Sequence, residues 1–196
     1  VMALPEFVIH AFHPADLAEY QRLDELTYDR KDKPQIQAMA QWLVEHLGEG
    51  EVAYMIPDDM LYNPGHLRNC DLPNHALDGK LPDSFSVPGT HNFPMQFFEA
   101  KYVLTADPFP LTHVNDPENE MSHKLNERFL AVRDEYFEQE ATFDMGNGTT
   151  FTIWRRTVAP TRAEVEYYLS AFTEEDAKYP EMFSEIAESW LAARGL

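Results

Sequence analysis

The stretch from Phe97 to Pro110, which reads FFEAKYVLTADPFP, constrains the fold more than any other part of the chain. At its centre, residues 102–105 (YVLT) are strand formers with no strict alternation, which favours a strand covered on both faces. Asp107 and Pro108 end the strand, because aspartate accepts hydrogen bonds from turn amides and proline cannot donate to a sheet. The stretch therefore predicts a central strand with an acid at its carboxyl end, where ligand crevices form in open α/β sheets.

Further elements are expected on both sides of this strand. Residues 34–47 repeat apolar side chains at helical spacing, and Gly48 is expected to cap that helix. Residues 51–56 (EVAYMI) read as a buried strand, and the charged segment 30–33 (RKDK) is expected to be solvated. Later in the chain we expect a helix from Ser122 to Tyr136, a hairpin with arms 138–145 and 149–158 around Asn147-Gly148, and a helix capped by Thr161 and Glu164.

These elements predict an α/β fold in a single domain that spans residues 1–196. The sheet is expected to be small and mixed, with four or five strands, helices packed on it and a helical pair at the C-terminus. The first two strands are expected to pair in parallel, because a long crossover joins them. Three segments complete the expected layout: an N-terminal entry segment at 1–33, a long loop rich in proline and glycine at 60–94, and the C-terminal helices at 161–196.

The charge balance narrows the classes of partner. The chain carries 15 Lys and Arg against 34 Asp and Glu, a formal net charge of −19. This charge repels phosphate backbones and anionic lipid headgroups, so no nucleic-acid partner is expected. A cationic partner and a generally acidic environment both remain open as explanations.

Motifs and single residues give little indication of catalysis or of metal binding. Cys70 is the only cysteine, which rules out an internal disulfide and a cysteine cluster for a metal. The sequence holds no GxSxG, P-loop, GxGxxG, CxxC or HExxH pattern, so no cofactor and no metal are expected. No apolar run approaches the roughly 20 residues of a membrane helix. Because the chain starts at Val1 rather than at methionine, we expect a segment of a longer protein.

Carboxylates follow the first two predicted strands. Asp58 and Asp59 come after the first, and Asp107 ends the second. If the strands are parallel neighbours, these acids share one edge of the sheet, where they would bind Mg²⁺ or Ca²⁺ or act as acid and base. The alternative is ordinary turn chemistry, since aspartate next to proline is common in turns.

Polar and aromatic residues gather in the long loop at 60–94. Sugar C–H faces stack on aromatic rings and sugar hydroxyls need polar partners, so such a loop suits a sugar platform. The rings would equally serve to pin the loop to the core. Together with the strand-end acids, the ligand-binding candidates are Asp58, Asp59, Tyr62, His66, His91, Asn92 and Asp107.

The order of segments is similar to that in a known family. A helix at 34–47 leads into GEGEVAYMI at 48–56, PGT at 88–90 precedes AKYVLTADPF at 100–109, and a later hairpin with TIWRR at 152–156 leads through TVAP to a capped helix. In this order, over most of residues 34–160, the chain resembles the soluble C-terminal region of large bacterial multi-spanning glycosyltransferases. Those proteins take sugar from a polyprenyl-phosphate donor and work on the outer face of the membrane.

The resemblance implies an accessory role without catalytic residues. In such proteins the catalytic acid lies in an outer loop between early membrane helices, a part that this chain does not contain. The implied partners are the membrane-embedded portion of the same polypeptide and a glycan or polyprenyl-linked sugar acceptor, at the extracytoplasmic face. Two alternatives stay open: a free-standing, cytoplasmic α/β enzyme that binds sugar or metal through its strand-end carboxylates, and an acidic protein-interaction module.

Overall fold

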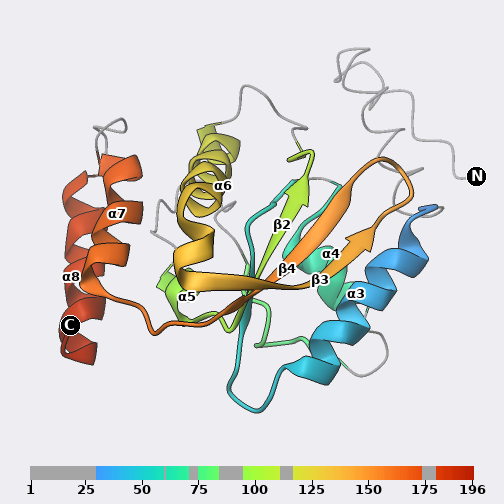
Figure 1. Cartoon of the computed structure of the whole chain (residues 1–196), viewed down its shortest axis with the longest axis horizontal. Helices are drawn as coiled ribbons and strands as arrows, with labels where there is room; N and C mark the ends of the chain where they lie inside the picture. The colour runs from blue at the N-terminus through green and yellow to red at the C-terminus, as the bar shows by residue number, and fades with distance from the viewer. Residues whose placement is uncertain (1–29, 60, 71–74, 84–94, 111–116, 174–179) are drawn as a thin grey trace, which may run out of the picture.

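The computed structural model describes residues 30–59, 61–70, 75–83, 95–110, 117–173 and 180–196 (Figure 1). In this part of the chain the elements follow the order α3 (Lys33–His46), β1 (Ala53–Met55), α4 (Pro64–Cys70), α5 (Met95–Glu99), β2 (Tyr102–Asp107), α6 (Pro117–Tyr136), β3 (Phe137–Asp144), β4 (Thr150–Arg156), α7 (Arg162–Thr173) and α8 (Pro180–Arg194). Helices and strands mix as the sequence predicts, and the class is α/β.

The four strands of the described residues form one sheet in the order β1-β2-β4-β3. β1 runs parallel to β2, with Met55 opposite Leu104, and the remaining pairs are antiparallel. β2 is therefore an inner strand, paired with β1 on one side and β4 on the other. The mixed sheet, the parallel first pair and the central position of residues 102–107 confirm the prediction.

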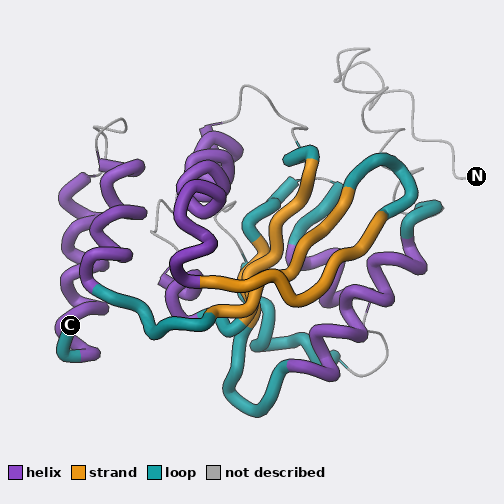
Figure 2. The backbone as a smooth tube through the Cα atoms, viewed as in Figure 1, coloured by secondary structure: helices purple, strands orange, loops and turns teal. Residues whose placement is uncertain are grey.

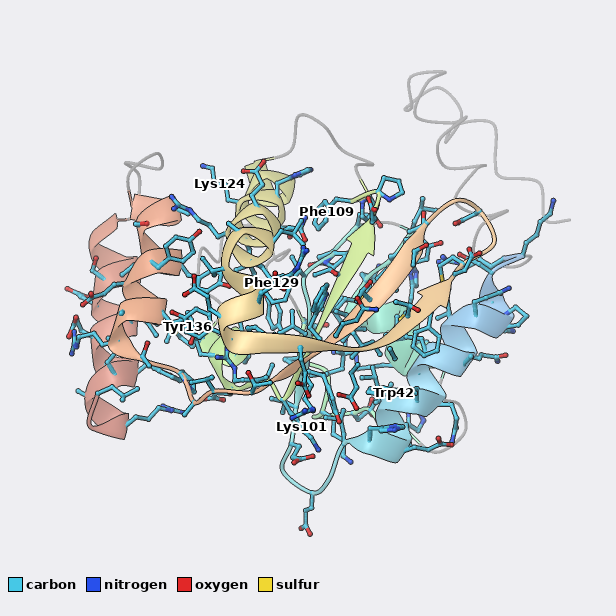
Figure 3. The ribbon with its side chains drawn as sticks, viewed as in Figure 1. Trp42, Lys101, Phe109, Lys124, Phe129 and Tyr136 are labelled. Carbon is cyan, nitrogen blue, oxygen red and sulfur yellow. The ribbon has the colours of Figure 1, made fainter. Side chains whose placement is uncertain are left out.

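One face of the sheet is covered by α5 and α6, with the α7–α8 pair packed beyond them (Figure 1). Phe97 is fully buried at the centre of this core, with its ring 4.8 Å from that of Tyr168 and 6.2 Å from that of Phe129. Figure 3 labels Phe129, which α6 contributes to this core. Edge-to-face aromatic pairs of this kind add to the free energy gained by burial.

The other face of the sheet is covered by α3 and α4. The helical spacing of α3 places Ile36, Met39 and Leu43 in one buried stripe. They pack against the alternate residues of β2 that point to this face, Tyr102, Leu104 and Ala106. Because both faces are covered, the run in β2 is buried without alternation up to Ala106.

One polar pair and one ion pair are built into the core at β4. The indole Nε1 of Trp154 donates to the hydroxyl of Thr105 at 2.9 Å. The guanidinium of Arg156 donates to both carboxylate oxygens of Glu164 at 3.0 Å, with 9% of the Arg156 side chain and none of the Glu164 side chain exposed. The connection at 157–161 that links them runs from the sheet to the helical pair (Figure 2).

The structure corrects the expected ends of two helices. α3 has Leu47 in an extended conformation at its C-cap, and the left-handed residue of the following turn is Gly50 (φ 73°), not Gly48. The backbone N–H of Gly48 donates instead to the Glu51 carboxylate at 2.7 Å. α6 begins at Pro117, so Ser122 lies inside that helix and does not cap it.

The long loop also contains structure that the sequence does not predict. α4 starts at Pro64, in a segment whose proline and glycine indicate a turn. The side chain of Asn63 accepts from the N–H of His66 at 3.0 Å and caps this helix. The capping of α7 is as predicted, since the N–H of Glu164 donates to the Thr161 hydroxyl at 3.1 Å. The N-terminal entry segment lies outside the described residues up to position 29.

Candidate functional site

The three predicted acids all follow strands at the same edge of the sheet. β1 and β2 are parallel, so Asp58, Asp59 and Asp107 lie toward the carboxyl ends of neighbouring strands, and Asp107 pairs in register with Thr150 of β4. Their surroundings differ, however. Asp107 is exposed, Asp58 is half-buried and Asp59 is buried.

Asp59 organises the turn that leads into α4. Its carboxylate accepts from the N–H groups of Leu61 and Tyr62 at 2.8 and 2.6 Å. Its own N–H donates to the Tyr62 carbonyl, and its carbonyl accepts from the Asn63 amide at 2.9 Å. These are turn contacts, so of the two readings of Asp59 the structure favours turn chemistry.

The charge of Asp58 acts on Tyr54 of β1. Burial raises the pKa of the Tyr54 phenol, and the charge of the nearby Asp58 carboxylate raises it further. Tyr54 belongs to the core under α5 and α6, whereas Tyr62 belongs to the core under α3 and α4. Asp58 thus acts electrostatically on Tyr54, whereas Asp59 bonds the turn at Tyr62.

Tyr62 is the centre of a partly buried set of hydrogen bonds, which we call the Tyr62 network: Arg30, Asp32, Tyr62 and Asn147. The Tyr62 hydroxyl donates to Asp32 Oδ2 at 2.6 Å and accepts from the Asn147 amide at 2.7 Å. Arg30 binds both oxygens of Asp32 at 2.8 Å. The Arg30 guanidinium also lies 4.9 Å from the centre of the Tyr62 ring. The network joins the start of α3, the loop after β1 and the β3–β4 turn.

The protonation states in this network follow from its contacts. Burial and the hydrogen bond to Asp32 raise the pKa of Tyr62 to about 12, so the phenol is a neutral donor at pH 7. Burial by itself would raise the pKa of Asp32, but the hydrogen bonds from Arg30 and Tyr62 outweigh it and lower that pKa below 3.8. Asp32 is therefore charged and paired with Arg30, and the network is electrically balanced.

His66 and Cys70 sit on α4 beside the network. Burial and the charge of Arg30 lower the pKa of His66, which keeps its ring neutral at pH 7. Its Nδ1 lies 3.1 Å from the Leu61 carbonyl, to which Arg30 also donates. Burial raises the pKa of the Cys70 thiol, which disfavours the nucleophilic thiolate.

The structure brings together only part of the predicted set. Asp59, Tyr62 and His66 are linked through the turn at 59–66, whereas His91 and Asn92 lie outside the described residues. Within the described ranges, no three His, Cys, Asp or Glu side chains are arranged to hold a metal ion.

Three members of the Tyr62 network were not among the predicted site residues. The segment 30–33 is expected to be solvated, yet only 6% of Asp32 is exposed. An aspartate before Pro34 indicates a helix cap, but the Asp32 carboxylate makes no cap bond and turns to Arg30 and Tyr62 instead. The Asn147-Gly148 pair does predict the hairpin turn, and Gly148 (φ 90°) has the left-handed conformation that glycine tolerates.

Chemically, this edge of the sheet is suited to fixing structure. Its phenol is neutral, its carboxylate is paired and its imidazole lies against a backbone carbonyl. The hydrogen bonds join segments that are 30 and 85 residues apart in the chain.

Comparison with family models, with curated proteins and with solved structures found no match for this chain. None of the helices in the described ranges combines the length and apolar character needed to cross a bilayer.

Proposed function

We propose that this chain is an extracytoplasmic, accessory domain of a membrane glycosyltransferase, with the catalytic residues in another part of the same polypeptide. The resemblance described above supports the family. Its three strand-forming segments, 51–56, 100–109 and 152–156, contribute the adjacent strands β1, β2 and β4. The strand-forming segments of the resemblance therefore lie next to one another in one sheet, which supports the proposal.

The observation that carries the accessory role is the Tyr62 network. In an open α/β sheet the carboxyl edge is where ligands usually bind. Here Asp32, Tyr62 and Asn147 occupy that region and bind one another. These three polar groups are engaged in holding α3, the loop after β1 and the hairpin together. A rigid unit of this kind suits a domain that supports or positions an acceptor for a neighbouring membrane part.

Fractionation of the source cells tests the proposal. An antibody raised against this chain should detect a band much larger than 22.7 kDa in the membrane fraction. The band should resist extraction with alkaline carbonate, as an integral membrane protein does. Protease added to intact spheroplasts should shorten it, because the domain faces outward.

A known cytoplasmic protein, blotted in the same samples, controls for lysis during the protease step. A soluble band near 22.7 kDa would overturn the proposal and leave a free-standing protein. A large membrane band that protease shortens only after the spheroplasts are lysed would overturn the extracytoplasmic location.

A further inference from the structure

A groove of about 550 Å³ lies at the edge of the sheet opposite to the Tyr62 network. The turn from α5 into β2 forms one side, the connection at 156–160 forms another, and the end of α8 closes it. Figure 3 labels Lys101 at this edge. The volume is in the range of sites that hold a small molecule, roughly 300–1,000 Å³.

The charge of the groove is opposite to that of the chain. Of its twelve lining residues, Lys101, Arg156 and Arg194 are cationic and only Glu99 is acidic. The whole chain has 15 cationic against 34 acidic residues. The acids that pair with Lys101 and Arg156, Glu51 and Glu164, are not among the lining residues. In these two pairs a ligand in the groove meets the cationic partner, whereas both Arg194 and its partner Glu99 line the groove.

Two of these cations are held in pairs that an anion can compete for. The Lys101 ammonium is 2.7 Å from Glu51, and their side chains are 33% and 39% exposed. Arg194 contacts Glu99, and their side chains are 40% and 41% exposed. Solvent-exposed ion pairs of this kind contribute little free energy, so exchange for another carboxylate or phosphate costs little.

Apolar surface lies beside the cations. Among the described residues, the exposed large hydrophobic side chains are Leu130, Val158 and Leu196, and the last two line the groove. Trp190 also lines it, with the Arg194 guanidinium stacked 4.0 Å from the centre of a Trp190 ring. The groove thus combines a cationic part with an apolar part.

We propose that this groove binds an anionic amphiphile, a molecule with one phosphate or carboxylate group on an apolar chain. The acid group lies between Lys101 and Arg194, and the apolar chain lies along Val158 and Trp190. The overall charge of −19 repels anions from the rest of the surface, so the groove is a local exception. This inference is independent of the proposed function, since it concerns the isolated chain.

Isothermal titration of the purified chain with decyl phosphate, kept below its micelle concentration, tests the proposal. We expect saturable binding of one molecule per chain that weakens as salt is added. Lys101→Gln and Arg194→Gln should each weaken binding about tenfold, because a hydrogen bond to a charged group is lost. Lys124→Gln is the matched control, since Lys124 lies on α6, on the side of the molecule away from Lys101 (Figure 3).

A second pair of variants tests the apolar part. Val158→Ser should weaken the binding of decyl phosphate several-fold, because apolar surface no longer covers the alkyl chain. Leu130→Ser removes a side chain of similar exposure, 41% against 45%, from α6 and should leave binding unchanged. Circular dichroism of each variant establishes that it is folded.

Four results would overturn the proposal. They are no saturable binding of decyl phosphate, equal binding of the uncharged decyl maltoside, equal binding of inorganic phosphate, and an equal loss in Lys124→Gln. Binding to phosphatidylglycerol vesicles that survives in Lys101→Gln and Arg194→Gln would assign membrane contact to another surface. None of these results bears on the cell fractionation, so the groove and the membrane glycosyltransferase can fail separately.

Discussion

Tyr62 contributes to stability through its hydroxyl as well as its ring. The hydroxyl both donates to Asp32 and accepts from Asn147, and only 1% of the residue is exposed. Tyr62→Phe should therefore lower the free energy of unfolding by about 1–3 kcal/mol, because the buried Asp32 and the more exposed Asn147 each lose a hydrogen bond. Urea unfolding measures the loss.

The control is Tyr167→Phe. In the described part of the chain, the Tyr167 hydroxyl donates only a long hydrogen bond, 3.5 Å to the Arg128 carbonyl. It should change the free energy of unfolding much less. Equal losses in the two variants would mean that the Tyr62 network adds no more than a peripheral hydrogen bond.

Asp32 makes the free energy of unfolding depend on pH in the acid range. Its pKa is lower in the folded chain than its ordinary 3.8, so the unfolded chain binds the proton more readily. The stabilisation is complete above the unfolded pKa and is lost as pH falls through the folded one. Asp32→Asn should cost about 1–3 kcal/mol at pH 7, and the difference from wild type should shrink below pH 4.

Unfolding midpoints in urea between pH 2.5 and pH 7 measure this effect. Asp83→Asn is the control, because the Asp83 side chain is 70% exposed in its pair with Arg68. If the stability lost in Asp32→Asn stays constant down to pH 2.5, the pKa of Asp32 is not lowered in the folded chain.

At the level of elements, the Arg156–Glu164 pair joins β4 to α7. Burial raises the pKa of Glu164 even though Arg156 and the Thr161 N–H favour its charged form. Arg156→Met should lower the free energy of unfolding by about 3–5 kcal/mol at pH 8, because Glu164 is left buried without its cation. Replacing both residues by Met should restore part of the loss.

The stability deficit of Arg156→Met should shrink toward low pH, as that of Asp32→Asn does, but at a higher pH, because the pKa of Glu164 is raised and that of Asp32 is lowered. A carboxylate whose folded pKa lies above its ordinary 4.5 binds its proton more readily in the folded chain. The deficit of Arg156→Met should therefore shrink as pH falls from 8 toward 4.5, as thermal unfolding across that range would measure. A deficit that grows instead would show that Glu164 stays charged in the variant.

Local periodicity is enough to predict most elements. The apolar spacing of 34–47 and the uninterrupted run at 102–105 locate α3 and β2, since these patterns match helix and buried-strand geometry. α4 is missed because Pro64 and Gly65 indicate a turn, while Pro64 in fact opens the helix. Proline suits both roles, and the sequence nearby does not decide between them.

The site is harder to predict than the fold. Parallel pairing of β1 with β2 correctly places the strand-end acids at one edge. The role of Asp59 in a turn follows from local chemistry, and it is one of the two readings the sequence allows. The Tyr62 network does not follow, because Asn147 reaches Tyr62 across 85 residues of sequence. Such contacts depend on the final packing and leave no periodic signal.

At the level of the whole molecule, the net charge of −19 opposes compaction. Sodium chloride screens this repulsion, so the melting temperature should rise between 20 and 300 mM salt and then level off. A gain of about 1 kcal/mol would correspond to about 2–4 °C in a chain of this size.

Differential scanning calorimetry measures this shift, and sucrose serves as an uncharged control at matched osmolality. A melting temperature that falls with salt would mean that ion pairs such as Arg162–Glu188 outweigh the general repulsion.

The position of β2 also determines the order in which parts of the chain open. Its backbone amides bond to β1 or to β4, and helices cover both of its faces. β3 has a partner on one side only within the described sheet. In deuterated water the amides of β2 should thus exchange last, through complete unfolding, while those of β3 that face away from β4 exchange early through local fraying.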